Sequence, residues 1–492
     1  MVVSAKGEDS TITSQGATTA YIIFFMLGVG NLLPWNAFIT AANYFHHRFC
    51  NTSHENTFES AFALTCNIAQ CMCLFLVVKY QNMFPINYQV IIPFLTIASC
   101  FMLTSIFVLI SMPGDQLFGI TIFLVLVTGS VTAVGNGGVV GVAAWFPPKY
   151  MSAVYTGQAL AGIIISVLEI VTTAANKTET PCSDDENNVD DDCSYDETSY
   201  SALSFFLLAT TTLLTCVAAF RHLMEMPITK YYQAKAECAG KGDVDRERSP
   251  SVGEGEEVTN ALAQSLLADD CGLGKNVGGA DNTSSADKMP PLPPRLKDST
   301  DGADTVSEGF GFTIDEIKET LKIIMVPALS VFNVYVVTIG VFPALTVLMK
   351  STQYCETDER FYNDLYVPFL FVMFNVGDFT GRSLAGMLPP LFTKSNIWIP
   401  SLLRWGFVPL FVHTNIDGNA LTNIFYNDAW PILWCLFLGM TNGYVTNLCM
   451  MFGPSMVAPN RASLAGTIML TFLSWGLLGG AVMSFAWVSL TL

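Results

Sequence analysis

Two opposite charges lie four residues apart in a mostly apolar stretch of the sequence. Asp378 and Arg382 both fall between Asn363 and Leu388, and this spacing places two side chains on one face of a helix, where they can pair. Arg382 offers a planar fork of hydrogen-bond donors, whereas Asp378 only accepts. Together with Asn375 in the same segment, they would suit a ligand with adjacent hydroxyls and a ring heteroatom. The alternative is a buried salt bridge that only holds helices together.

Ionisable side chains inside a membrane-spanning segment are functional candidates, because a charge at bilayer depth costs at least about 2.5–3.5 kcal/mol. Few such residues occur in this sequence. Besides the pair, Glu169 lies near the outer end of its apolar segment, and Arg404 has no obvious partner nearby in sequence.

A second polar group lies in the first apolar segment. Pro34 removes a backbone hydrogen bond and is expected to kink a helix there. Trp35 and Asn36 then offer a stacking face and an amide at mid-membrane depth, which a flat heteroaromatic ligand would use. The alternative is an ordinary kinked and packed helix. Asn136, which lies among glycines in a later segment, is a further polar candidate.

The elements that must position these residues are long apolar segments. A segment of 18 or more residues with almost no charge is typical of a transmembrane helix, and continuous apolar character excludes the alternating strands of a membrane β-barrel. The sequence predicts an all-α polytopic membrane protein with eleven such helices. They are Thr19–Tyr44, Glu59–Lys79, Asn87–Ser111, Leu117–Phe146, Met151–Ala175, Ser201–Leu223, Leu321–Met349, Asn363–Leu388, Asn396–Val412, Ala429–Phe452 and Ala462–Leu490.

Lys and Arg residues in short loops predict the orientation. Ten of them fall on the side that holds the N-terminus and the long central segment, and four fall on the other side. The N-terminus is therefore expected in the cytosol and, with an odd number of helices, the C-terminus outside. The predicted domains are a cytosolic segment (1–18), a six-helix bundle (19–223), a disordered cytosolic linker (224–319) and a five-helix bundle (320–492).

The net charge of −18 is concentrated in two segments. The outer loop 176–200 and the stretch 223–320 carry −17 of it, so the membrane body is nearly neutral. No basic stripe is present, which excludes a nucleic-acid partner. The linker is rich in Gly, Ser and acidic residues, a composition typical of disorder. Its segment Pro290–Arg295 would suit docking into an aromatic groove, or would serve as a stiff spacer.

The predicted outer loops carry modification candidates. Asn51 and Asn176 each begin an N-glycosylation sequon. Cys182 and Cys193 share one short acidic loop in an oxidising compartment, where a disulfide between them is plausible. Free thiols and other pairings stay open. The other outer-loop cysteines that could pair instead are Cys50 and Cys355.

No enzyme motif is present in the sequence. It contains no phosphate-binding loop, no H-E-x-x-H and no G-x-S-x-G, and we expect neither a metal nor a cofactor. Without an ATP-binding motif, a secondary transporter or facilitator is the simplest class. The binding site of such a protein lies near the midplane, between two helix bundles that rock against each other.

In order and spacing, the motifs resemble the equilibrative nucleoside transporters over essentially all of the apolar segments. The most specific matches are Pro34-Trp35-Asn36, Gly377–Arg382, Asn442-Gly443-Tyr444 and Phe452-Gly453-Pro454. The long acidic inner loop is more similar to protozoan members than to animal ones. The resemblance implies a fold related to the major-facilitator architecture, with six plus five helices, and nucleoside transport across the plasma membrane by alternating access.

The resemblance also implies roles for single residues. It assigns the ribose hydroxyls and part of the base to Asp378 and Arg382. Asn136 stands where the family has a glutamine that contacts the base, and its shorter side chain is expected to alter base selectivity. Lys149, at the cytosolic end of the predicted fourth helix, is the gating candidate. The remaining predicted lining residues are Leu32, Trp35, Asn36, Ile39 and Leu477.

Three alternatives remain open at this point. A nucleobase permease of the same fold would lack a ribose to place on the charged pair. A receptor or scaffold would use the acidic, proline-rich linker to recruit partners. Within the family itself, transport ranges from facilitated to proton-coupled. If this protein is proton-coupled, the resemblance makes Asp378 the first candidate for carrying the proton and Glu169 the second.

Overall fold

The structure is a computed structural model that describes residues 16–50, 52–54, 57–110, 112–175, 198–247, 312–416 and 424–491. These residues are almost entirely helical, and the extended pairing among them is confined to two isolated bridges. The helices are α2 (Ala17–Thr40), α3 (Ala42–Arg48), α4 (Phe58–Tyr80), α5 (Ile86–Leu109), α6 (Gly114–Ala143), α7 (Pro148–Ala175), α8 (Thr198–Glu225), α9 (Pro227–Glu247), α11 (Ile314–Val341), α12 (Tyr366–Met387), α13 (Trp398–Leu403), α14 (Phe407–Val412), α15 (Ala429–Ser455) and α16 (Ala462–Thr491).

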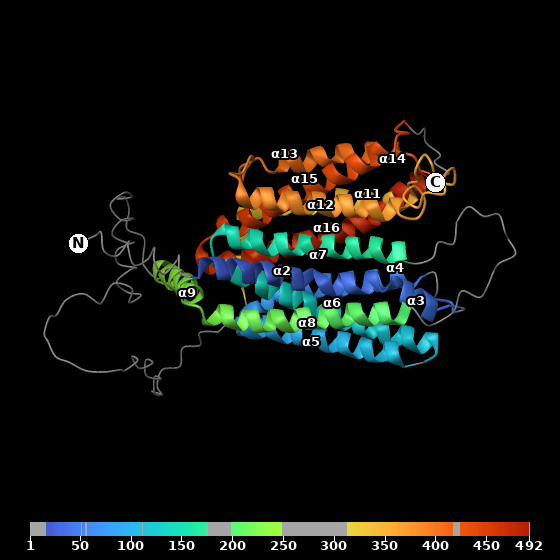
Figure 1. Cartoon of the computed structure of the whole chain (residues 1–492). Helices are drawn as coiled ribbons and strands as arrows, with labels where there is room; N and C mark the ends of the chain where they lie inside the picture. The colour runs from blue at the N-terminus through green and yellow to red at the C-terminus, as the bar shows by residue number, and fades with distance from the viewer. Residues whose placement is uncertain are drawn as a thin grey trace.

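The long helices run side by side as one bundle (Figure 1). In the described part of the chain, eight are long and apolar enough to cross a membrane: α4, α5, α6, α7, α8, α11, α15 and α16. The other three predicted spans correspond to α2, to α12 and to α13 with α14. Of these, Ala17–Leu33 and Trp398–Val412 are shorter apolar helices. The all-helical membrane fold is confirmed, and the count of eleven spans stays a prediction.

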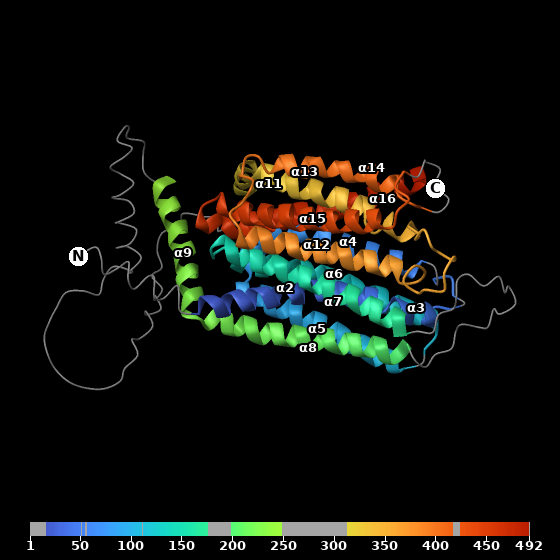
Figure 2. The same ribbon diagram turned by 45° about the horizontal axis from the view of Figure 1, so that its top comes forward.

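The helices pair in a pattern that repeats along the chain. In the first half (α2–α8), α2 packs on α7 and α4 packs on α6; in the second half (α11–α16), α11 packs on α16 and α12 packs on α15. The first helix thus pairs with the fifth and the second with the fourth in both halves. The halves meet chiefly where α7 contacts α12 and where α4 contacts α16. This repeat agrees with the predicted six-plus-five pseudo-symmetric arrangement (Figures 1 and 2).

The prediction of a disordered linker over residues 224–319 is wrong at both ends of that segment, where the structure has helices. Pro227 begins α9, since proline is well suited to a first helical turn, and the helix continues to Glu247. It packs on the short 3-10 turn Pro459–Arg461 and lies across the end of the bundle (Figure 2). At the other end, Thr313 and Glu316 form a reciprocal capping box that starts α11. Average composition concealed both local signals.

Several sequence predictions lie outside the described residues. They are the segment 1–15, the acidic loop 176–197, the linker 248–311 with Pro290–Arg295, the sequon residues Asn51 and Asn176, and the cysteines Cys182 and Cys193. Of the alternative cysteines, Cys50 and Cys355 are each disulfide-bonded.

Helices α12 and α15 approach each other closely through two pairs of glycines. A Cβ added to Gly377 or Gly381 in α12 would collide with the α15 backbone. A Cβ added to Gly439 or Gly443 in α15 would collide with the α12 backbone. Both helices therefore carry a Gly-x-x-x-Gly pattern at their mutual contact, where small residues allow backbones to pack directly.

We expect Gly439→Ala to destabilise the protein by about 1–3 kcal/mol, as overpacking of a close contact does. Its new methyl group would meet the carbonyl oxygen of Phe374. Gly119→Ala is the matched control, since the space beside that glycine is open. Thermal unfolding of the detergent-purified variants measures the difference, and equal melting temperatures for the two would contradict the packing argument.

Candidate functional site

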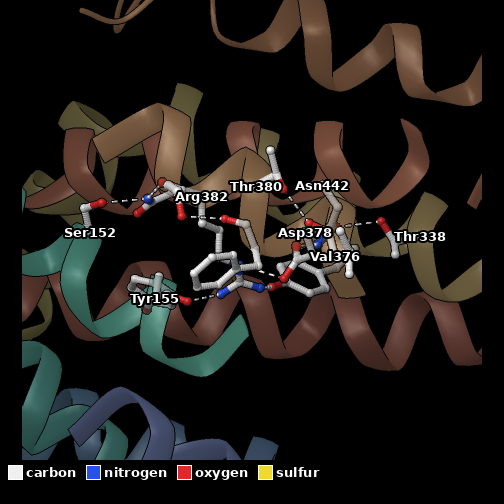
Figure 3. A network of polar contacts seen from close by, with 12 residues as sticks. Ser152, Tyr155, Thr338, Val376, Asp378, Thr380, Arg382 and Asn442 are labelled. Carbon is white, nitrogen blue, oxygen red and sulfur yellow. Dashed lines mark hydrogen bonds and ion pairs between the residues drawn. The ribbon is translucent and has the colours of Figure 1, made fainter. Parts of the chain in front are cut away.

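The polar centre of the second half is an ion pair on α12. Arg382 Nε lies 2.9 Å from Asp378 Oδ2, as the spacing of four residues predicts, and each residue is only 5% exposed. Figure 3 shows the two side chains directed toward each other. Removing one partner of such a buried pair leaves an uncompensated charge and costs about 3–5 kcal/mol.

The second oxygen of the carboxylate is also bonded. The Asn442 amide in α15 donates from Nδ2 to Asp378 Oδ1 at 2.7 Å, and the Thr338 hydroxyl in α11 lies 2.8 Å from Asn442 Oδ1 (Figure 3). Three helices thus contribute to the environment of one carboxylate. Both residues lie in motifs that carry the family resemblance, but the two are 104 residues apart, so the sequence gave no sign that they touch.

Arg382 joins the two halves of the bundle. Its Nη1 donates to the backbone carbonyl of Tyr155 in α7 at 2.9 Å, and its Nη2 lies 3.5 Å from the hydroxyl of Tyr335. Nearby, Asn447 Nδ2 donates both to Ser152 Oγ in α7 at 2.8 Å and to the Arg382 carbonyl at 2.7 Å. The charged pair therefore lies where α12 meets α7, and a movement between the halves must change its bonds.

Arg404 is a third buried charge close to this centre. It is 2% exposed and lies in the 3-10 turn Arg404–Gly406 between α13 and α14. It donates to Thr338 Oγ1 at 2.6 Å, to the Leu438 carbonyl at 3.1 Å and to the Thr441 hydroxyl. Its partners are far away in sequence, which is why the sequence showed none.

The structure describes only some of the other predicted binding-site side chains. Asn136 in α6 is 7% exposed, and its Oδ1 has no hydrogen-bond partner among the described residues. Asn375 is half-buried and donates to the Phe371 carbonyl of its own helix at 3.0 Å. Leu32 and Leu477 are half-buried. The side chains of Trp35, Asn36 and Ile39 lie outside the described residues, although α2 itself runs through their positions.

The two remaining candidates lie on α7. Lys149 is exposed and lies in the first turn of α7, just beyond the end of α6, because Pro148 begins the new helix. Its Nζ is 5.0 Å from the ring centre of Tyr150. Glu169 is half-buried toward the opposite end of α7.

Two further polar contacts between the halves had no signal in the sequence. At one end of the bundle, Arg360 donates to the carbonyls of Thr173 and Ala174 in the last turn of α7, both at 2.7 Å. At the other end, Thr467 Oγ1 in α16 donates to Gln81 Oε1, just beyond α4, at 2.6 Å. The side chains that make these contacts are single polar residues outside the long apolar segments or at their ends. Nothing in the neighbouring sequence indicates their partners.

A bundle of two packed halves with a buried polar centre between them is the architecture of a secondary transporter. Two solved structures share this fold: the proton:xylose symporter XylE (TM-score 0.55, 11% identity, 96% of this chain and 88% of that chain) and the E. coli fucose:proton symporter FucP (TM-score 0.50, 12% identity, 95% of this chain and 90% of that chain). The protein has the major-facilitator fold.

The family follows from sequence comparison. The nucleoside transporter family matches residues 122–489, and the chain belongs to this family. The protein is therefore a transporter and not an enzyme. Human equilibrative nucleoside transporter 1 is 29% identical over 94% of this chain and 96% of its own length. Arabidopsis thaliana equilibrative nucleotide transporter 1 is 26% identical over 98% and 89%. The resemblance in the sequence motifs is confirmed.

We expect Asp378→Ala and Arg382→Ala each to lower uptake of a radiolabelled nucleoside at least about tenfold per transporter at the cell surface, because each leaves the other charge unpaired. Asp378→Asn keeps the size of the side chain and separates loss of the charge from loss of packing. Arg461→Ala is the control, since Arg461 pairs with Glu319 in an exposed position. Wild-type uptake in either alanine variant would overturn the importance of the pair.

Proposed function

We propose that this protein carries nucleosides across the plasma membrane by alternating access, with the Asp378–Arg382 pair as the centre of the binding site. The observation that carries the proposal is the position of the pair. It is buried, it offers donors beside acceptors, and it is bonded across the contact between the two halves. Membership of the nucleoside transporter family supports a nucleoside as the substrate.

The chemistry of the pair suits a ribose. Vicinal hydroxyls can each donate and accept, and an arginine fork beside a carboxylate supplies the matching groups. The Arg382 Nη1 bond to the Tyr155 carbonyl links the halves directly. When α12 and α7 separate, this donor becomes available for a substrate oxygen. Substrate binding would then replace a bond between the halves, which couples occupancy to the movement.

The base is assigned to the first half. Asn136 supports this role because it is buried with an acceptor that no described residue satisfies, and such an acceptor suits an N–H donor of a base. The proposal keeps Asn375 and the apolar or stacking residues as the rest of the lining and Lys149 as the gating residue. The lining residues of this group are Leu32, Trp35, Asn36, Ile39 and Leu477.

The proposed topology has a cytosolic N-terminus and an extracellular C-terminus. Glycans at Asn51 and Asn176 would then face outward, and a partner docking at Pro290–Arg295 would face the cytosol. The proposal needs no cofactor. The alternative substrate class, a free nucleobase, would leave the charged pair without its ribose.

Competition experiments distinguish these substrates. We expect unlabelled nucleosides to inhibit uptake of a labelled nucleoside at concentrations at least about tenfold below those of the corresponding free bases, because a ligand without ribose leaves buried polar groups unpaired. Uptake is measured in cells that lack their own nucleoside transport. Equal inhibition by base and nucleoside would favour the nucleobase permease.

The proposal extends to proton coupling through Asp378, with Glu169 as the second candidate. A nucleoside is neutral, so a proton carried with it moves positive charge inward. We expect uptake to be faster from a mildly acidic medium than from a mildly alkaline one, with a substrate-induced inward current. Asp378→Asn should abolish the current. Flat uptake without current would exclude coupling and leave nucleoside transport itself standing.

A further inference from the structure

Arg404 lies deep in the second half, where no carboxylate of the described residues is paired with it. No described residue forms an ion pair with it, and its bonds go to the neutral acceptors of Thr338, Thr441 and Leu438. A buried guanidinium costs several kcal/mol to desolvate. A neutral side chain at this position would avoid that cost. The presence of the charge therefore indicates a role for the guanidinium other than packing.

The bonds of Arg404 lead directly to the carboxylate of the charged pair. Arg404 Nη2 donates to Thr338 Oγ1, Thr338 lies against Asn442 Oδ1, and Asn442 Nδ2 donates to Asp378 Oδ1, at 2.6, 2.8 and 2.7 Å respectively. Each step joins a donor to an acceptor. The chain connects the turn between α13 and α14 to α11, α15 and α12 in that order.

The hydrogen atoms in this chain can be counted. Thr338 has one hydroxyl proton and two acceptors within reach, Asn442 Oδ1 and the Val334 carbonyl, both at 2.8 Å. Only donation to Asn442 satisfies the amide oxygen, because the Val334 carbonyl already accepts within its helix. Arg404 donates to the same hydroxyl oxygen, which strengthens the bond that the hydroxyl donates onward.

Arg404 also holds the backbone segment that carries Asn442, through the adjacent residue Thr441. Its Nη1 is bonded to Thr441, the residue next to Asn442 on α15, while its Nη2 is bonded to Thr338 on α11. The two helices that flank the Asn442 amide are thus held by one planar guanidinium. This arrangement sets which end of the amide faces Asp378.

We infer that Arg404 is a positioning residue for substrate recognition, which acts through Thr338 and Asn442 to hold one oxygen of Asp378 in a fixed place. The inference rests on the proposed function, in which Asp378 accepts from the ribose hydroxyls. With one carboxylate oxygen fixed by Asn442 and the other by Arg382, the remaining lone pairs have a defined direction toward the sugar. Arg404 then determines how well the transporter distinguishes a ribose from a sugar without its hydroxyls.

The test compares a nucleoside with its 2′,3′-dideoxy analogue as competitors for uptake. We expect the wild type to prefer the nucleoside, and Thr338→Val and Arg404→Met to lose most of that preference through an about tenfold rise in the nucleoside KM, the size expected for a lost charge-linked hydrogen bond. Thr338→Ser, which retains the hydroxyl, should keep the preference. The variant that combines Thr338→Val with Arg404→Met should lose no more of the preference than either single variant, because both substitutions break the same chain of hydrogen bonds.

Asn333→Ala is the matched control. Asn333 in α11 accepts from Trp405 Nε1 and donates to the Ser401 carbonyl, at 2.9 and 2.8 Å, so it holds the same turn to α11 without touching the chain of bonds. It should keep the preference even where its surface level falls. An unchanged preference in Thr338→Val, or an equal loss in Asn333→Ala, would overturn the inference; Thr338→Val also decides the question if Arg404→Met does not reach the surface.

Asp378→Asn separates this inference from the proposed function. If Asp378→Asn loses the preference and the Thr338 and Arg404 variants keep it, the role of Arg404 is wrong and the ribose site stands. If Asp378→Asn keeps the preference, the ribose site itself is wrong, and the inference that depends on it is overturned as well.

Discussion

A buried ion pair is stable only where the surrounding donors and acceptors satisfy both charges, and this constraint organises the second half of the bundle. Each of the two charges also has a partner on another helix: Asp378 accepts from Asn442 of α15, and Arg382 donates to the Tyr155 carbonyl of α7. Thr338 from α11 supports Asn442. The relative positions of four helices therefore depend on two charges, and these charges lie at the contact between the two halves.

Short polar side chains reach each other only if the helices that carry them are close. The glycines at the α12–α15 contact provide that closeness, since Gly443 lies directly against the Asp378 backbone and Gly381 against Met440. Asn442 is the neighbour of Gly443, so the same contact brings its amide to the carboxylate. The hydrogen bond therefore depends on the close packing of the two helices. A larger residue at these glycines would move the Asn442 amide away from Asp378.

Polar contacts between the halves are distributed along the bundle. Arg360 binds the last turn of α7 at one end, Gln81 binds Thr467 of α16 at the other, and Arg382 binds α7 between them. Hydrogen bonds of this kind can be exchanged for bonds to water or substrate at small net cost. An alternating-access cycle would break them in turn at the two ends, with the central bond released to the substrate.

The sequence by itself determined the all-helical membrane class, the two halves, the pairing of Asp378 with Arg382 and the family, because these follow from apolar length, helical spacing and ordered motifs. It misjudged α9 and the start of α11, since both ends of an acidic segment carry local helix signals that average composition conceals. Only the tertiary structure showed Arg404 bonded to Thr338 or Arg382 bonded to α7. Those partners lie 66 and 227 residues apart, and such contacts arise from how helices pack, which no local spacing records.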